Sequence, residues 1–196
     1  MRMDGKIRQK YYELLWRIFR FDAWHITPYK ERPYAKEMVR DINNMLAKSP
    51  KQRGSYIVEV GCGLGDIISG IHADRKCKLG LDVDKKVIRA AKAAHPCNRF
   101  MAGSFSNLHH KTIQFLIAVN FLHTLDGQTV EYLLGNVTKE NQIQYIVVDK
   151  VESPAYQYAH DYDAIMGRYG YGLYKKSKRY EAYKRSSRWI LIYKKG

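Results

Sequence analysis

The pattern of apolar and polar positions begins with two predicted helices. Between residues 10 and 21 aromatic and aliphatic side chains recur at helical spacing, which predicts a short helix packed on the core. A second helix is predicted from Pro33 until Lys48-Ser49-Pro50 ends it. Its apolar residues follow the i, i+3, i+4, i+7 rule: Ala35, Met38, Val39, Ile42, Met45 and Leu46. The stretch from Phe21 to Tyr29 between the helices has no period and is predicted as a loop.

Five apolar runs then alternate with helical segments and predict a parallel α/β sheet. The runs are residues 56–60, 78–83, 99–102, 113–119 and 143–149. The run 113–119 is continuously apolar, which is typical of a strand buried on both faces. Helices are predicted at 66–71, at 84–95 with Asp84 as N-cap, and from about 130 to Gly135-Asn136. After Gly172 the pattern alternates without a clear helix and ends in a strand at 189–193.

A glycine-rich turn follows the first predicted strand and opens a helix. Glycines stand at positions 61, 63 and 65, directly after Glu59-Val60. Such glycines let the backbone bend sharply and let a ligand approach where a Cβ would intrude, which favours a ligand site over a plain connector. A dinucleotide-binding turn needs its third glycine at position 66, where this chain has Asp66. The spacing is therefore G-x-G-x-G, and a nucleoside-like ligand is expected.

Four polar residues follow the predicted strands where open α/β sheets bind ligands. Glu59 and Asp82 end the first and second strands, and Ser104 and Asn120 come just beyond the third and fourth. Because the carboxyl ends of parallel strands meet at one edge, these side chains are expected to line one crevice. Carboxylates accept hydrogen bonds from ammonium groups and from pairs of hydroxyls. Asp82 has an alternative role as a strand-end cap, whereas capping of the following helix is expected from Asp84.

The glycine turn after an acidic residue, with a second acid seventeen residues after Gly65, resembles the cofactor motifs of class I S-adenosylmethionine-dependent methyltransferases. Five alternating units followed by a terminal hairpin are also similar to that fold. The resemblance implies a Rossmann-like α/β fold, with a mostly parallel seven-stranded sheet and a C-terminal antiparallel hairpin. One domain is expected over residues 1–196, with N-terminal helices acting as a lid over 1–50 and the cofactor-binding sheet over 54–196.

The resemblance also implies S-adenosyl-L-methionine as the cofactor. Glu59 would serve the methionine ammonium, and Asp82 would accept both ribose hydroxyls. The other implied cofactor positions are Gly61, Cys62, Gly63, Gly65, Val83, Ser104, Phe105, Asn120 and Phe121. Ser104 stands where the family usually has an Asp that meets the adenine amino group. Its hydroxyl can still bond the base, and Phe105 can pack on the ring.

The sequence Asn120-Phe121-Leu122-His123 resembles the family's fourth motif, near which cofactor and acceptor meet. It lacks the Asn or Asp followed by Pro-Pro and an aromatic residue that the family uses for base N-methylation, which disfavours that reaction on DNA or RNA. Methylation of a hydroxyl needs a general base. The candidates, without a ranking, are His123, His25 in the aromatic loop, and His160 in the Tyr158–Asp163 stretch. His123 could instead be a core histidine, and His160-Asp161 the start of a capped helix.

The chain is strongly basic, with a net charge of +15. This charge favours an anionic partner, such as nucleic acid, a phosphorylated or nucleotide-linked substrate, or anionic lipid, although solvated surface lysines explain it equally well. Residues 168–196 carry one acid, Glu181, and ten basic residues: Arg168, Lys175, Lys176, Lys178, Arg179, Lys184, Arg185, Arg188, Lys194 and Lys195. Interleaved tyrosines suit an RNA groove, and an exposed sheet-edge hairpin explains the same composition.

Several classes of protein are disfavoured by the remaining features. No apolar run approaches the roughly 18 residues of a membrane span, and no apolar segment follows the basic start, so a cytoplasmic protein without a signal peptide is expected. Cys62, Cys77 and Cys97 are widely spaced and odd in number, which predicts neither disulfides nor a metal site. We expect a methyltransferase acting at oxygen of a small-molecule or glycan-linked acceptor. An RNA methyltransferase and a non-catalytic cofactor-binding protein of the same fold are the alternatives.

Overall fold

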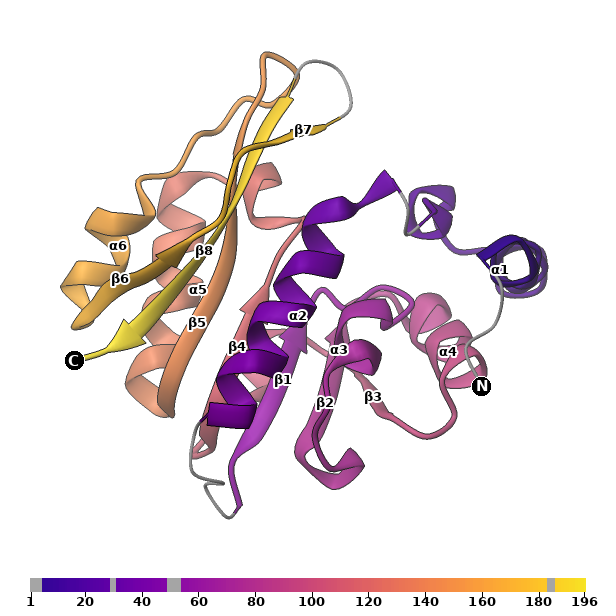
Figure 1. Cartoon of the computed structure of the whole chain (residues 1–196), viewed down its shortest axis with the longest axis horizontal. Coiled ribbons are helices and arrows are strands. Elements are labelled where there is room, and N and C mark those ends of the chain that lie inside the picture. Colours follow the sequence, from indigo (N-terminus) through magenta and orange to yellow (C-terminus); the bar gives the residue numbers. More distant parts are fainter. Residues whose placement is uncertain (1–4, 29–30, 49–53, 183–185) are drawn as a thin grey trace.

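The computed structural model describes residues 5–28, 31–48, 54–182 and 186–196, and within them it forms one eight-stranded sheet (Figure 1). The strands are β1 (Tyr56–Val60), β2 (Lys78–Asp82), β3 (Arg99–Ala102), β4 (Thr112–Ala118), β5 (Gln142–Glu152), β6 (Tyr171–Lys176), β7 (Tyr180–Ala182) and β8 (Ser186–Lys195). Their order is β3-β2-β1-β4-β5-β8-β6, and β7 pairs with β8 beside this path.

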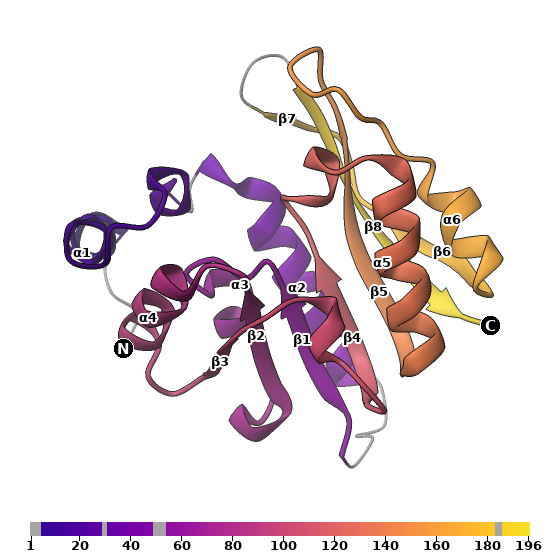
Figure 2. The same cartoon turned by 180° about the vertical axis from the view of Figure 1, so that it is seen from behind.

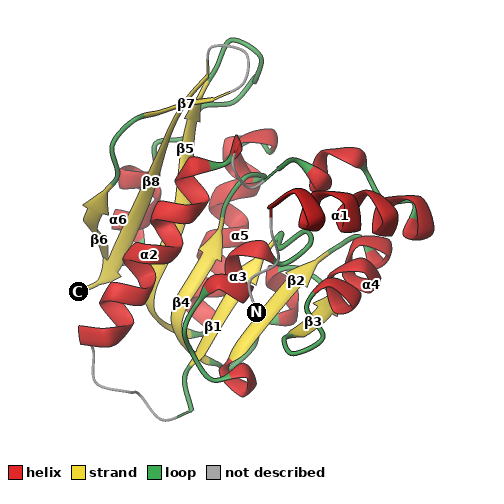
Figure 3. Ribbon diagram, turned by 45° about the vertical axis from the view of Figure 1, so that its right-hand side comes forward, coloured by secondary structure: helices red, strands yellow, loops and turns green. Residues whose placement is uncertain are grey.

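The first five strands are parallel, and β8 runs antiparallel to both β5 and β6. Val58 at the centre of β1 pairs with Leu79 of β2 on one side and with Leu116 of β4 on the other. The seven-strand path with its C-terminal antiparallel hairpin confirms the predicted fold class, and the short β7 is an addition to it. In Figure 3 the arrowheads of β1, β2 and β4 point to one edge of the sheet, where a ligand crevice is expected.

Helices cover both faces of the sheet and one end (Figures 1 and 2). The helices are α1 (Gly5–Phe19), α2 (Pro33–Lys48), α3 (Asp66–Gly70), α4 (Lys85–Ala94), α5 (Gly127–Glu140) and α6 (Tyr162–Arg168). Residues of α2, α3 and α4 form one apolar cluster with the sheet, and residues of α5 and α6 form a second. Helix α1 packs on α4 through a third cluster that includes Tyr12 and Leu15. The strands at the centre are therefore buried on both faces, as the apolar run 113–119 predicts.

Several elements differ from the expectations, and β5 and β8 extend beyond the predicted runs 143–149 and 189–193. Helix α1 begins at Gly5 rather than near Lys10, and the predicted loop contains a 3₁₀ turn, η1 (Ala23–Ile26). Helix α5 continues past Gly135-Asn136 to Glu140. Gly135 faces Tyr169, whose hydroxyl occupies the space that a Cβ would need. Gly135 therefore allows close packing of α5 against Tyr169 and does not mark the end of the helix. Tyr29, Ser49 and Pro50, which belong to the predicted loop and helix end, lie outside the described residues.

Candidate active site

The glycine turn between β1 and α3 has the backbone conformation that only glycine adopts easily. Gly61, Gly63 and Gly65 have φ angles of +71°, +53° and +79°. A Cβ on Gly61 would lie 2.6 Å from the ring of Phe121, and one on Gly63 would lie 2.9 Å from Nδ1 of His25. The turn is therefore closely covered on both sides, and larger residues would disrupt it.

Asp82 at the end of β2 is buried and supports the turn directly. Its Oδ2 accepts a hydrogen bond of 2.9 Å from the Gly63 amide, and its Oδ1 accepts one of 3.0 Å from the Asp84 amide. Asp84 accepts from the Lys86 amide and is the N-cap of α4, as predicted. Asp82 is thus placed against the glycine turn, and the capping of α4 is left to its neighbour.

Glu59 of β1 is a buried carboxylate, with 2% of its surface exposed. Its Oε2 accepts a hydrogen bond of 2.9 Å from the Ile68 amide in α3. Burial raises the pKa of Glu59 to about 8, although the hydrogen bond from Ile68 acts in the opposite direction. A cationic group close to this carboxyl would lower its pKa again.

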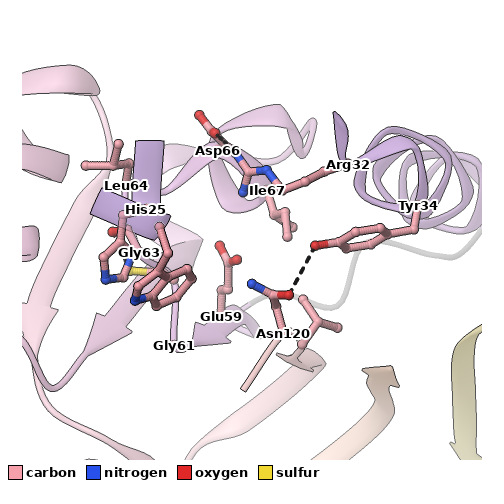
Figure 4. A pocket seen from close by; sticks show the side chains of 13 residues that line it. His25, Arg32, Tyr34, Glu59, Gly61, Gly63, Leu64, Asp66, Ile67 and Asn120 are labelled. Atoms are coloured by element: carbon pink, nitrogen blue, oxygen red, sulfur yellow. Dashed lines mark hydrogen bonds and ion pairs between the residues drawn. The ribbon is translucent and has the colours of Figure 1, made fainter. Parts of the chain in front are cut away.

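A cavity opens beside Glu59 at the carboxyl ends of β1 and β4. Figure 4 shows its wall on one side formed by His25 and the glycine turn, and on the other by Arg32, Tyr34 and Asn120. The lining residues are Trp24, His25, Arg32, Tyr34, Glu59, Gly61, Cys62, Gly63, Leu64, Asp66, Ile67, Val119 and Asn120. The N-terminal segment, residues 5–28 and 31–48, thus contributes four lining residues to a crevice whose floor comes from the sheet.

The 3₁₀ turn η1 places two aromatic side chains over the glycine turn. The rings of Trp24 and His25 stack with centroids 3.7 Å apart, and the His25 ring lies directly against Gly63. Burial lowers the pKa of His25, while the charge of Asp82 acts to raise it. The neutral imidazole is therefore the main form of His25 at pH 7.

Asp66 fastens the N-terminal segment to the start of α3. Its carboxylate is bound by Arg8, by Arg32 at 2.5 Å and by the Tyr12 hydroxyl at 2.5 Å, and His95 Nε2 lies 3.7 Å away. Burial alone would raise the pKa of Asp66, but His95, Arg32 and Arg8 together hold it below its ordinary value. In the sequence, Asp66 stands out only as the residue at the place of a third glycine, because its partners lie far away along the chain.

A buried ion pair supports the opposite wall. Arg188 of β8 contacts the Asp149 carboxylate at 2.9 Å, and the backbone amide of Asn120 donates a hydrogen bond of 2.8 Å to the same carboxylate. The Asn120 side-chain oxygen accepts from Arg188 at 2.8 Å and from the Tyr34 hydroxyl at 3.4 Å. Asn120 has a φ of +71°, and this network holds it in that conformation.

Two of the three candidate bases lie together beyond this wall. His123 is buried against Tyr156, with ring centroids 4.4 Å apart, and its Nδ1 has no hydrogen-bond partner among the described residues. Burial lowers the pKa of His123, and the charges of Asp149, Arg188 and His160 also act on it. Nε2 of His160 lies 3.0 Å from the Leu122 carbonyl oxygen. Asp161 caps α6, which matches the alternative of a capped helix start.

The remaining predicted cofactor positions lie around the same edge but do not all face the cavity. Val83 is 76% exposed beside Asp82, and Cys62 is buried within the turn. The Ser104 hydroxyl caps the short 3₁₀ turn η4 (Phe105–Asn107). Phe105 is buried in the core beside Phe121, with ring centroids 6.2 Å apart. Ser104 and Phe105 therefore have structural roles that the motif comparison did not anticipate.

Four of the eight described basic residues of the C-terminal segment 168–196 form ion pairs within the protein. Arg188 pairs with Asp149, Arg168 with Glu131, Lys175 with Asp41, and Lys178 with Glu37. Lys184 and Arg185 lie outside the described residues. These ion pairs weaken the interpretation of this segment as an open RNA groove.

The strand order and the crevice at the strand ends define the class I methyltransferase fold. Magnesium protoporphyrin IX methyltransferase from Synechocystis PCC 6803, crystallised with S-adenosylmethionine, aligns over 100% of this chain and 99% of its own, with 16% identity and a TM-score of 0.66. TehB from Haemophilus influenzae aligns over 82% of this chain and 62% of its own, with 9% identity and a TM-score of 0.63. A candidate RNA methyltransferase from Pyrococcus horikoshii aligns over 86% of both chains, with 13% identity and a TM-score of 0.60.

The likeness to these proteins lies in the fold. The sequence matches no family profile and no curated protein sequence. The chain therefore has the class I methyltransferase fold, with sequence identities of 9–16% to these three structures.

Proposed function

We propose that the protein is an S-adenosylmethionine-dependent methyltransferase that acts at oxygen of a small-molecule or glycan-linked acceptor. The observation that carries this proposal is the three-glycine turn bounded by two buried carboxylates, Glu59 and Asp82. Its support from other proteins is the shared fold, including a structure crystallised with this cofactor. When bound, the cofactor supplies a methyl group on a positively charged sulfur.

The residues around the turn fit this cofactor. Asp82 would accept the ribose hydroxyls, and Glu59 would pair with the methionine ammonium, which removes the penalty of its buried charge. Arg32 lines the same cavity and would face the cofactor carboxylate. Val83, exposed beside Asp82, offers an apolar surface for the adenine. The His25 ring lies against Gly63, where the cofactor would lie, so η1 must shift when the cofactor binds.

For the proton of the acceptor hydroxyl we favour His123 among the three histidines. Its Nδ1 is buried with no hydrogen-bond partner among the described residues, and its lowered pKa, like that of His25, keeps the imidazole neutral at pH 7, as a base must be. His160 Nε2 is engaged near the Leu122 carbonyl, and His25 lies over the glycine turn. His123→Asn should lower kcat by about 10²-fold or more, with little change in cofactor affinity. A similar loss in His25→Asn but not in His123→Asn would move the role to His25.

An RNA methyltransferase is the second candidate function. The net charge of +15 and the fold shared with a candidate RNA methyltransferase favour it. The internal ion pairs of the C-terminal segment and the absence of the base N-methylation signature after Asn120 speak against it. RNA binding would weaken steeply with added salt, because counterions are released on binding.

The decisive experiment follows labelled methyl from the cofactor into a cell extract divided into RNA, protein, and small-molecule or glycan fractions. The proposal expects label in the small-molecule or glycan fraction. Label confined to RNA would replace it with the second candidate. Cofactor binding without transfer to any fraction would support a non-catalytic binding protein, and Asp82→Ala should abolish even that binding.

A further inference from the structure

Helix α1 has two apolar faces, and the described fold uses only one of them. Tyr12 and Leu15 are buried against α4. Ile7, Leu14 and Ile18 are 60%, 52% and 60% exposed. Their spacing of seven and then four residues places these three side chains in one stripe along the helix. Figure 1 shows α1 at the outer end of the molecule, beyond α4.

Basic side chains border this apolar stripe. Lys6, Lys10 and Arg17 are exposed on the flank of α1 next to the stripe, and Glu13 is the only acid of the helix. Helix α4, which packs on α1, adds four exposed basic residues and contains no acid: Lys85, Lys86, Arg89 and Lys92. This end of the molecule therefore combines exposed aliphatic side chains with concentrated positive charge.

We propose that α1 docks this protein on an anionic lipid surface, with the Ile7–Leu14–Ile18 stripe entering the headgroup region. An interfacial helix needs an apolar stripe beside Lys and Arg, and α1 has both. Charge complementarity selects this occupant, because a second copy of the chain would bring the same basic residues of α1 and would itself carry a net charge of +15. None of the described helices is long and apolar enough to cross a bilayer.

The same helix contacts the edge of the cavity. Arg8 and Tyr12 bind the Asp66 carboxylate, which lines the cavity wall. A surface that holds α1 therefore also holds the N-terminal segment that covers the glycine turn. The docking does not depend on the proposed methyl transfer, so an experiment can disprove either proposal without touching the other.

The test is sedimentation of the full chain with vesicles of phosphatidylcholine, with and without phosphatidylglycerol. The expected result is binding to the anionic vesicles alone, weakened by salt. Ile7→Ser/Leu14→Ser/Ile18→Ser should lower the affinity at least tenfold. Tyr132→Ser, at an exposed position of α5, is the matched control and should bind like the parent protein.

A charge series uses the same vesicles. Lys6→Gln/Lys10→Gln/Arg17→Gln should lower the affinity more than Lys36→Gln/Lys48→Gln/Lys76→Gln, which removes three exposed lysines of other elements. Circular dichroism checks that each variant is folded. If the serine variant is unfolded, the charge series alone tests the proposal. No binding to anionic vesicles, or equal effects of both charge series, would overturn the proposal. A dimer in light scattering that the serine variant abolishes would assign the stripe to a second copy instead.

Discussion

Arg188 of β8 and Asp149 of β5 form an ion pair of 2.9 Å inside the sheet, and both side chains are buried. The guanidinium also lies over the ring of Tyr34, 4.4 Å from its centroid, and donates to Asn120. One pair of charges thus positions two residues of the cavity wall. The antiparallel strand β8 contributes to the candidate site through this contact.

Removing one member of this pair should leave an uncompensated buried charge. Arg188→Met is expected to lower the free energy of unfolding by about 3–5 kcal/mol. The double variant Arg188→Met/Asp149→Asn should recover part of that loss, because the Asn120 amide keeps an acceptor and no charge is stranded. Urea unfolding of the three proteins measures this difference. Equal stability of the single and double variants would contradict the coupling.

Glu59 should release a proton when the cofactor binds. Its pKa of about 8 means that the free protein holds this carboxyl largely protonated at pH 6.5, whereas a bound ammonium favours the carboxylate. Calorimetry of S-adenosylhomocysteine binding, in buffers of different ionisation enthalpy, should report about one proton released by the parent protein and almost none by Glu59→Gln. Equal release by both proteins would remove Glu59 from the ammonium contact.

The same raised pKa of Glu59 also makes the stability of the ligand-free protein depend on pH. The folded state holds its proton up to about pH 8, whereas the unfolded chain loses it near pH 4. The stability that Glu59 contributes is therefore fully present below about pH 4 and is lost as the pH rises toward 8. Glu59→Gln should flatten the fall of stability with pH in this window, as measured by thermal unfolding.

The glycine turn offers a matched pair of substitutions. Gly63→Ala adds a Cβ against His25 at a φ of +53°, and Gly54→Ala adds one at a φ of +81° with no atom within 4 Å. Both should lose about 1 kcal/mol of stability from the left-handed backbone. Only Gly63→Ala should weaken S-adenosylhomocysteine binding, by tenfold or more in an equilibrium titration. Similar weakening by Gly54→Ala would show that the effect is general destabilisation.

Asp66→Asn should loosen the N-terminal segment. We expect a loss of about 3 kcal/mol at pH 7, because Arg8 and Arg32 lose their buried carboxylate. The pKa of Asp66 is lowered in the folded state, so its contribution is present above about pH 4 and is lost as the pH falls further. The variant should therefore differ from the parent less at pH 3 than at pH 7. Unfolding curves at both pH values test this, and a constant difference would exclude a charge effect.

Gly135 tests close packing in the middle of α5. Gly135→Ala should lose about 1–3 kcal/mol, because the new Cβ meets the Tyr169 hydroxyl. Tyr169→Phe in the same background should recover part of this loss. Gly167→Ala in α6, where no atom lies within 4 Å of the added Cβ, should be neutral or gain up to about 1 kcal/mol. Stabilisation by Gly135→Ala would contradict the contact.

The sequence predicts most elements because their signals are local. The apolar period over α2 and the runs at β1 and β3 give their bounds correctly. Gly135-Asn136 misled the prediction, since a helix end and a glycine packed against Tyr169 look alike in sequence. The partners of Asp66 come from Arg8, Tyr12 and Arg32, far away along the chain. Only the folded chain brings such partners together, so no local pattern reveals them.

The stacked rings of Trp24 and His25 over Gly63 have a kinetic consequence. A ligand that occupies the glycine turn must wait for η1 to open, and η1 is held by a segment whose ends are fixed through Arg8 and Arg32 to Asp66. We therefore expect the exchange rate of the cofactor, rather than its affinity alone, to follow the strength of the Asp66 contacts. Stopped-flow release of S-adenosylhomocysteine should be faster in Asp66→Asn than in the parent, and an unchanged rate would mean that η1 opens independently. If release is faster in Asp66→Asn, the ligand-free protein rests in a closed state, and exchange of the cofactor depends on a local opening of the N-terminal segment.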